Sequence, residues 1–122
     1  HRDVSQFEPK DIRRNMPRFE ADNYAQNLKL LDQIEQIAIA ENCTLAQLSL
    51  SWLLGQGDNI IPIPGTTRLK HLRENIEATN IELSDSSSQQ LDKIINQSSV
   101  SGARYNAATQ AEIDTEEFSW SQ

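Results

Sequence analysis

The chain is 122 residues long, has one cysteine and carries a formal net charge of −7, which limits it to one domain at most. With 37% hydrophobic and 24% charged residues, its composition is typical of a soluble globular protein on the polar side of average. The acidic balance disfavours nucleic acid as a partner, because binding to a phosphate backbone needs clustered Lys and Arg. The net charge is still compatible with one small basic anion pocket. The single cysteine, Cys43, excludes a disulfide framework within the chain.

The sequence shows no sign of export or of membrane insertion. No apolar run approaches the roughly 20 residues that span a bilayer, and no signal-peptide pattern is present. We therefore expect no membrane partner and a cytoplasmic location. The chain begins with His1 instead of Met, which agrees with a processed or partial sequence.

The first 25 residues are predicted to form a long loop. Pro9 and Pro17 interrupt any long helix there, and only residues 11–15 suit a single helical turn. Loops of this length are uncommon in compact domains unless they cover a site or belong to a larger frame.

The next residues predict two helices. Apolar side chains at helical spacing indicate a helix over 26–41, with Asn42 as its C-terminal stop. Thr44 and Gln47 have the spacing of a capping box, which predicts the start of a second helix that Gly55 ends.

Two more helices are predicted in the second half of the chain. One covers about 68–78, and the other follows Ser84, which suits an N-cap. Residues 97–122 are Ser-rich and then acidic, and we interpret them as a C-terminal loop and tail.

Between these helix pairs, residues 59–63 predict one clear buried strand. They contain Ile60, Ile61 and Ile63 and are bounded by Gly and Pro. One strand cannot form a sheet, since its backbone groups need a neighbouring strand. Either the chain is a fragment, or it associates with another chain to complete a sheet.

The segment after this strand has the features of an anion site. A turn at Gly65 leads into a helix start, where the first amides are unpaired and the helix dipole is positive. Thr66 and Thr67 add hydroxyl donors, and Arg68 adds a planar fork of donors that suits phosphate. His71 lies one helical turn later, near the same place.

Further along this helix, Lys70 and Arg73 add positive potential, and Glu74 and Asn75 can hydrogen-bond an amino-purine edge. The alternative is that Thr67 caps the helix and that the charges form its solvated face. No G-x-G-x-x-G and no Walker motif is present, so neither a Rossmann site nor a P-loop is indicated.

These residues closely resemble the C-terminal signature of the aldo-keto reductases. The resemblance rests on Ile-Pro-Ile-Pro-Gly-Thr-Thr-Arg at 61–68, on Glu-Asn-Ile at 74–76 and on Ile-Glu-Leu-Ser at 81–84. The helix at 44–54 resembles the one that precedes the last barrel strand. The pyridoxal-reductase-like and auxin-induced-type branch is indicated by Pro17-Arg18-Phe19, Asn23, Asn27-Leu28 and Gly102-Ala103-Arg104-Tyr105.

The resemblance implies an α/β fold in which residues 1–122 are the C-terminal part of a single (β/α)8 barrel domain that binds NADP(H). Matching positions place Gly65, Thr66, Thr67 and Arg68 around the adenosine 2′-phosphate with His71 nearby, and Glu74 and Asn75 at the adenine. Many members carry Lys at the position of Gly65, and several carry Arg at that of His71. These departures leave Arg68 as the main phosphate ligand.

The activity that the resemblance implies is NADPH-dependent reduction of aldehydes or ketones, with a small carbonyl compound as substrate. The Asp-Tyr-Lys-His tetrad of the family lies in the first half of the barrel, and its motifs do not occur here. We assign no catalytic residue and no metal ligand to this chain, Tyr24 and Tyr105 included, and expect it to be inactive alone. Two alternatives remain: a non-catalytic, nucleotide-sensing module of the same fold, and a helical interaction domain without a ligand.

Overall fold

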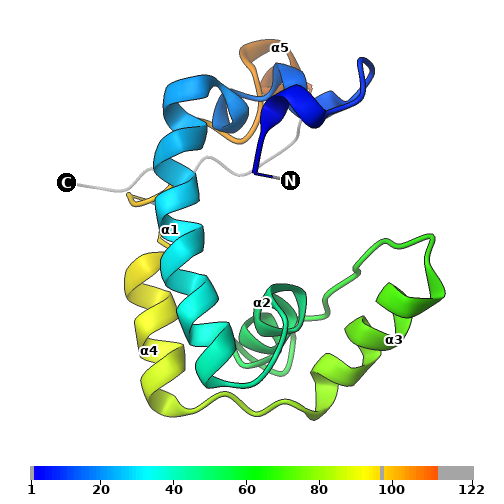
Figure 1. Ribbon diagram of the computed structural model, residues 1–122, viewed down its shortest axis with the longest axis vertical. Coiled ribbons are helices and arrows are strands. Elements are labelled where there is room, and N and C mark those ends of the chain that lie inside the picture. The colour runs from blue at the N-terminus through cyan, green and yellow to red at the C-terminus, as the bar shows by residue number, and fades with distance from the viewer. Residues whose placement is uncertain (1, 97, 113–122) are drawn as a thin grey trace. The chain divides into compact units, whose positions relative to one another are not determined.

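The computed structural model describes residues 2–96 and 98–112, and these fall into two compact units (Figure 1). The terminal unit contains His1–Leu28 and Val100–Gln122, and the central unit contains Lys29–Ser99. His1 and the part of the predicted tail beyond residue 112 lie outside the described residues.

The terminal unit is more helical than its sequence predicts. Its elements are η1 (Val4–Gln6), η2 (Ile12–Asn15), η3 (Pro17–Phe19), the first turns of α1 (Ala21–Ala40), and α5 (Ala107–Ala111). The helical turn predicted near 11–15 is confirmed by η2, but the prediction of a long loop over residues 1–25 is wrong. Short-range caps explain the difference, because the side chains of Asp3 and Asp11 accept hydrogen bonds from the N–H groups of Ser5 and Arg13.

Aromatic packing gives the terminal unit a small core. Phe7 is buried, and its ring meets that of Phe19 edge-on with the centroids 5.6 Å apart. The ring of Phe19 lies 5.5 Å from that of Tyr24, and the guanidinium of Arg13 lies 4.0 Å from the Phe7 centroid. Aromatic pairs and a cation–π contact of this kind stabilise a segment that has few aliphatic residues.

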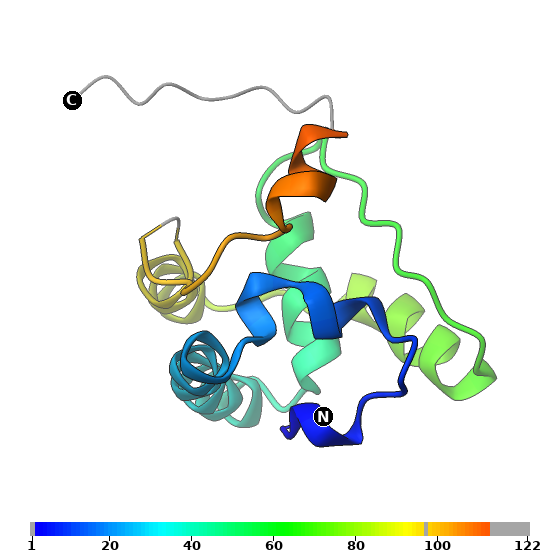
Figure 2. The ribbon, with the colours of Figure 1, turned by 90° about the horizontal axis from the view of Figure 1, so that it is seen from above.

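The central unit is a group of helices around one aliphatic core. After α1 it contains α2 (Leu45–Leu54), α3 (Leu69–Glu77), η4 (Ala78–Asn80) and α4 (Asp85–Ile94). The views in Figures 1 and 2 both show α4 beside the second half of α1. The buried core residues come from α1, α2 and α4 and are Ile37, Ala38, Leu48 and Leu91.

The predicted helix boundary at Asn42 is confirmed by its geometry. Asn42 has a φ of 51°, in the left-handed region. The N–H of Cys43 donates to the carbonyl of Ala38 at 2.9 Å, and the N–H of Asn42 donates to that of Ile39 at 3.1 Å. These two bonds form a Schellman motif, which satisfies the last carbonyls of α1.

The predicted caps of α2 and α4 are also confirmed. The N–H of Gln47 donates to the Thr44 hydroxyl at 3.2 Å, and the Gln47 side chain accepts from the Thr44 N–H at 3.1 Å, which completes the capping box. Ser84 caps α4 by accepting from the N–H of Ser87 at 3.2 Å. Gly55 is the C-cap of α2, as predicted.

The prediction of a clear buried strand at 59–63 is wrong. The described part of the chain has no strand, and the residues between α2 and α3 form a coil (Figures 1 and 2). Ile61 is 81% exposed and Ile63 is 92% exposed. Strand geometry depends on pairing with a neighbour, and no other described segment supplies one.

Among the described residues, no single helix is long and apolar enough to cross a membrane, and only α1 and α2 together, across an 84° bend, reach that length and composition.

Candidate functional site

The start of α3 lacks a side-chain cap. Arg68 is the N-cap residue, with an extended backbone (φ −116°, ψ 127°), and its side chain makes no capping hydrogen bond. The interpretation of Thr67 as the cap is therefore wrong. The hydroxyl of Thr66 instead accepts the N–H of Arg68 itself, at 3.2 Å. The amides of the first α3 turn, Leu69 to His71, thus keep their hydrogen-bonding capacity for another acceptor.

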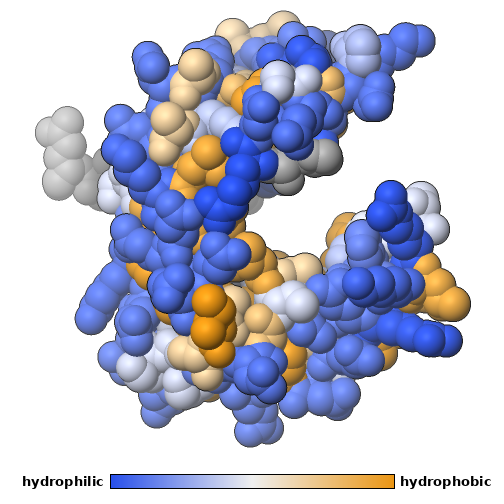
Figure 3. All heavy atoms as spheres, viewed as in Figure 1, coloured by the Kyte–Doolittle hydropathy of each residue, from blue (hydrophilic) through white to orange (hydrophobic). Residues whose placement is uncertain are grey.

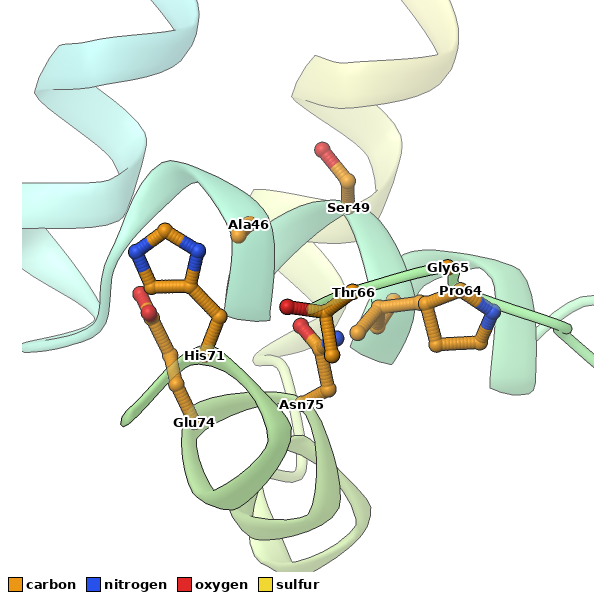
Figure 4. A pocket seen from close by; sticks show the side chains of 9 residues that line it. Ala46, Ser49, Pro64, Gly65, Thr66, His71, Glu74 and Asn75 are labelled. Atoms are coloured by element: carbon orange, nitrogen blue, oxygen red, sulfur yellow. The ribbon is translucent and has the colours of Figure 1, made fainter. Parts of the chain in front are cut away.

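An open hollow lies beside this helix start, between α2, α3 and the segment that connects them. Its volume is about 560 Å³, within the range of small-molecule sites. It is lined by Ala46, Ser49, Leu50, Pro64, Gly65, Thr66, His71, Glu74 and Asn75. Figure 4 shows that His71, Glu74 and Asn75 come from α3, whereas Pro64, Gly65 and Thr66 come from the segment that precedes it.

The structure brings most of the predicted nucleotide residues together in this hollow. Gly65, Thr66, His71, Glu74 and Asn75 line it. Thr67 and Arg68 do not line it, and both are exposed on the turn that joins Thr66 to α3. No described residue forms a hydrogen bond or ion pair with the Arg68 guanidinium, so this exposed side chain is available to an anion.

Two hydrogen bonds hold α2 against the α3–η4 segment. The side-chain amide of Gln47 donates to the carbonyl of Glu74 at 3.3 Å. The buried hydroxyl of Ser51 donates to the carbonyl of Ala78 at 3.0 Å. Because Ala46 and Ser49 stand on the same stretch of α2, these bonds also fix the α2 side of the hollow.

The charged side chains of α3 are mostly solvated. Lys70 and Arg73 are exposed and line a second groove, which α3 forms with the Thr44 end of α2. Glu74 is half-buried and lines both the hollow and this groove. The hollow therefore contains the Glu74 carboxylate, whereas Lys70 and Arg73 lie outside its lining.

Gly65 is not required by the local backbone. Its φ is not in the left-handed region, and a Cβ built on it would meet nothing within 4 Å. The predicted role of this glycine, to admit a close approach to the backbone, stays a prediction.

A second cluster, in the terminal unit, was not predicted from the sequence. The Asn27 side chain donates to the carbonyl of Ser101 at 2.9 Å and accepts the Ser101 N–H at 2.8 Å. The Ser101 hydroxyl donates to Asn23 Oδ1 at 2.7 Å, and Arg18 Nε donates to the Gly102 carbonyl at 3.3 Å. We call this set of residues the asparagine clasp. Its members other than Ser101 belong to the motifs quoted above, but their separation along the chain hides their contact.

Three other described side chains could be reactive, but each contacts neighbouring residues of the fold. They are Tyr24, Tyr105 and Cys43. The ring of Tyr24 packs on Phe19, and Tyr105 lies under the Arg104 guanidinium at 5.3 Å. Burial and the nearby Glu41 carboxylate raise the pKa of Cys43, which keeps its thiol protonated. No group of three or more metal-ligating side chains occurs among the residues that the structure describes.

Comparison with known proteins finds one family and several similar chains. The model of the "Aldo/keto reductase family" matches residues 2–96. The aldo-keto reductase yakc of Schizosaccharomyces pombe, whose name specifies NADP(+), is 48% identical over 99 residues, which cover 81% of this chain and 29% of that protein. The aldo-keto reductase str7 of Strobilurus tenacellus is 39% identical, with coverage of 80% and 29%. The probable aldo-keto reductase 1 of Glycine max is also 39% identical, with coverage of 73% and 26%.

The chain spans about 29% of the length of the first of these relatives. No solved structure matches it. Because the family model covers residues 2–96, which include the hollow and the start of α3, this chain belongs to the aldo/keto reductase family.

Proposed function

We propose that this chain is the adenosine-phosphate-binding part of an NADP(H)-dependent oxidoreductase that reduces aldehydes or ketones to alcohols. The observation that carries the proposal is the start of α3, where the uncapped amides and the unpaired Arg68 guanidinium directly follow Gly65 and Thr66, which line a ligand-sized hollow. In the whole protein, NADPH supplies a hydride to the carbonyl carbon.

The chemistry of the helix start fits a phosphate. The first amides of a helix and its positive dipole attract anions, and Arg68 adds donors that match two phosphate oxygens. Thr66 lines the hollow, and the next residue, Thr67, is exposed. The 2′-phosphate of the cofactor is the group that these donors would hold. The name of the S. pombe relative, which specifies NADP(+), supports this choice.

The remaining residues of the hollow fit a purine. Glu74 and Asn75 are half-buried and line the hollow from α3, where a carboxylate and an amide can pair with an exocyclic amino group and a ring nitrogen. Pro64 and Ala46 supply apolar surface for the face of the base. This chain would thus bind and orient the cofactor, while the residues that donate the proton lie outside it.

The unpaired segment at 60–63 fits a position within a barrel. The family fold is a (β/α)8 barrel, in which phosphate sites commonly follow the last strands. Ile61 and Ile63 expose apolar side chains directly before the phosphate-binding turn. We propose that these residues form a barrel strand when the neighbouring strands of the whole protein pair with them.

The test is cofactor titration of the full-length protein that the gene containing this sequence encodes. Arg68→Ala should raise the dissociation constant for NADPH by about 10- to 100-fold, because a hydrogen bond to a charged group contributes about 1.5–3 kcal/mol. It should leave the constant for NADH nearly unchanged, because NADH lacks the 2′-phosphate. Arg73→Ala is the matched control on the same helix. Equal NADPH affinity in the wild type and Arg68→Ala would remove Arg68 from the site.

A further inference from the structure

We infer that residues 100–112 form a C-terminal strap, which opens from the rest of the terminal unit as one cooperative segment while the central unit stays folded. The strap includes α5 and belongs to the same compact unit as residues 1–28. The asparagine clasp holds it there, through hydrogen bonds that join residues 74 to 84 positions apart in the sequence. This inference is independent of the proposed function.

The strap is attached mainly by polar groups. None of the described residues 100–112 is fully buried, whereas Leu48 in the core of the central unit has no exposed surface. Side chains that keep contact with water gain little hydrophobic stabilisation, which depends on the apolar area removed from water. The net contribution of each hydrogen bond is also small, because water competes for the same groups. The strap should therefore open at a lower free energy than the central core.

The clasp holds the strap in one register. Asn27 pairs with both backbone groups of Ser101, and Asn23 Oδ1 accepts the Ser101 hydroxyl. The next residue is Gly102, whose φ of +84° and close approach to the rest of the unit require the absence of a Cβ. A slip by one residue would place Gly102, which has no hydroxyl, opposite Asn23, and Ala103 in the position that requires glycine. The strap is thus either engaged in this register or released.

Release of the clasp should also unfold α5. This helix has five residues, Ala107–Ala111, and helices so short are unstable in water without tertiary support. Its N-cap residue, Asn106, donates its side-chain amide to the carbonyl of Asn15 at 3.4 Å, which connects the helix start to the rest of the terminal unit. The backbone amides of Ser101 and Gln110, which are both hydrogen-bonded, should therefore lose their protection in the same opening event.

The experiment is amide hydrogen exchange of the full-length protein, followed by NMR. In the wild type, the amides of Ser101 and Gln110 should have similar protection factors, lower by about tenfold or more than that of Ile37 in the core. Asn27→Ala removes both bonds to Ser101. It should lower the protection factors of Ser101 and Gln110 together, by about 10- to 100-fold, and leave that of Ile37 unchanged.

Two further variants make the test independent of the Asn27 substitution. Ser101→Ala removes only the hydroxyl bond to Asn23, and it should lower the protection of the strap by a smaller factor, about two- to tenfold. Gln26→Ala is the matched control, because Gln26 is exposed on α1 next to Asn27. It should leave the protection of the strap unchanged.

Three results would overturn the inference. A loss of protection at Ser101 without a loss at Gln110 would show that the strap does not open as one segment. An equal loss at Ile37 would show that the clasp supports the whole fold. Wild-type protection of Ser101 as high as that of Ile37 would show that the strap opens only when the whole protein unfolds.

Discussion

Gly102 occupies a backbone conformation that other residues rarely adopt. Its φ is +84°, and a Cβ built on it would lie 2.8 Å from Asn23 Nδ2 and 2.9 Å from the carbonyl oxygen of Pro17. The glycine thus allows the chain to pass close to the turn at Pro17. There the Gly102 carbonyl accepts a hydrogen bond from Arg18 Nε. The asparagine clasp depends on this approach.

Gly102→Ala should therefore destabilise the full-length protein by about 1–3 kcal/mol, from the strained φ and the two short contacts. Urea unfolding measures the change. Gly55→Ala is the control, because a Cβ there would meet its nearest atom at an ordinary 3.5 Å and its φ of −73° suits alanine. Equal stabilities of the two variants would show that the clasp does not require glycine.

The candidate site illustrates how far single residues can be predicted from the sequence. Gly65, Thr66 and His71 could be placed together because they are close in the sequence, on a turn and on the first turn of the helix that follows it. The contact of Asn27 with Ser101 could not, because it joins residues 74 positions apart and depends on how the terminal unit folds. Asn27 belongs to a motif quoted above and Ser101 directly precedes another, but the sequence does not show that these two residues meet.

At the level of helices, Glu41 joins the end of α1 to the start of α4. Its carboxylate accepts the hydroxyl of Ser84 at 2.7 Å and the N–H of Ser84 at 3.3 Å. Hydrogen bonds from the side chains of Ser87 and Ser84 lower the pKa of Glu41 below its ordinary value of 4.5. The ionised carboxylate therefore stabilises the N-cap of α4, in addition to the cap that Ser84 itself provides.

The sign of the resulting pH dependence follows from the lowered pKa. The stabilisation is fully present above about pH 4.5 and is lost as the pH falls through the lower folded-state pKa. Glu41→Gln should thus be less stable than the wild type at neutral pH, and the difference should shrink on acidification. Urea unfolding across this range measures it. In a Ser84→Ala background the effect of Glu41→Gln should be smaller, and an unchanged effect would contradict a role for this hydrogen bond.

The helices were more predictable than the strand, and the reason is physical. The boundaries at Asn42, Thr44 and Ser84 follow from hydrogen bonds within a few residues, so their signals are local. The apolar pattern of 59–63 indicates burial and strand propensity, but a strand also needs a partner that no described segment provides. The apolar pattern thus predicts a buried strand with a neighbouring strand, which the described residues alone do not supply.

The whole chain exposes more apolar surface than one would expect of a complete small domain. In Figure 3, apolar surface is visible near the α3 end of the central unit, on the face shown. Large apolar side chains that are at least 45% exposed occur on η2, on α1, on α3 and in the segment before α3, and they are Ile12, Ile39, Ile61, Ile63, Leu69, Leu72 and Ile76. Monomers rarely leave so many such residues uncovered, and the remaining strands and helices of a barrel would cover them.

Expressed alone, the chain should accordingly be marginally stable. We expect a broad thermal transition and binding of a hydrophobic dye such as ANS, because the core contains few buried side chains and the apolar residues of α3 face solvent. Circular dichroism and dye fluorescence measure both properties, with the full-length protein as the control. A sharp, cooperative transition of a monomer without dye binding would show that the described residues form a complete fold.

The central claim concerns the position of one phosphate, and a crystal structure of the full-length protein with NADP⁺ tests it most directly. The account predicts the 2′-phosphate within hydrogen-bonding distance of the Arg68 guanidinium and of an amide in the first turn of α3, with residues 60–63 paired as a barrel strand. A phosphate held elsewhere, or a hollow between Gly65 and Asn75 filled by other parts of the protein, would contradict it.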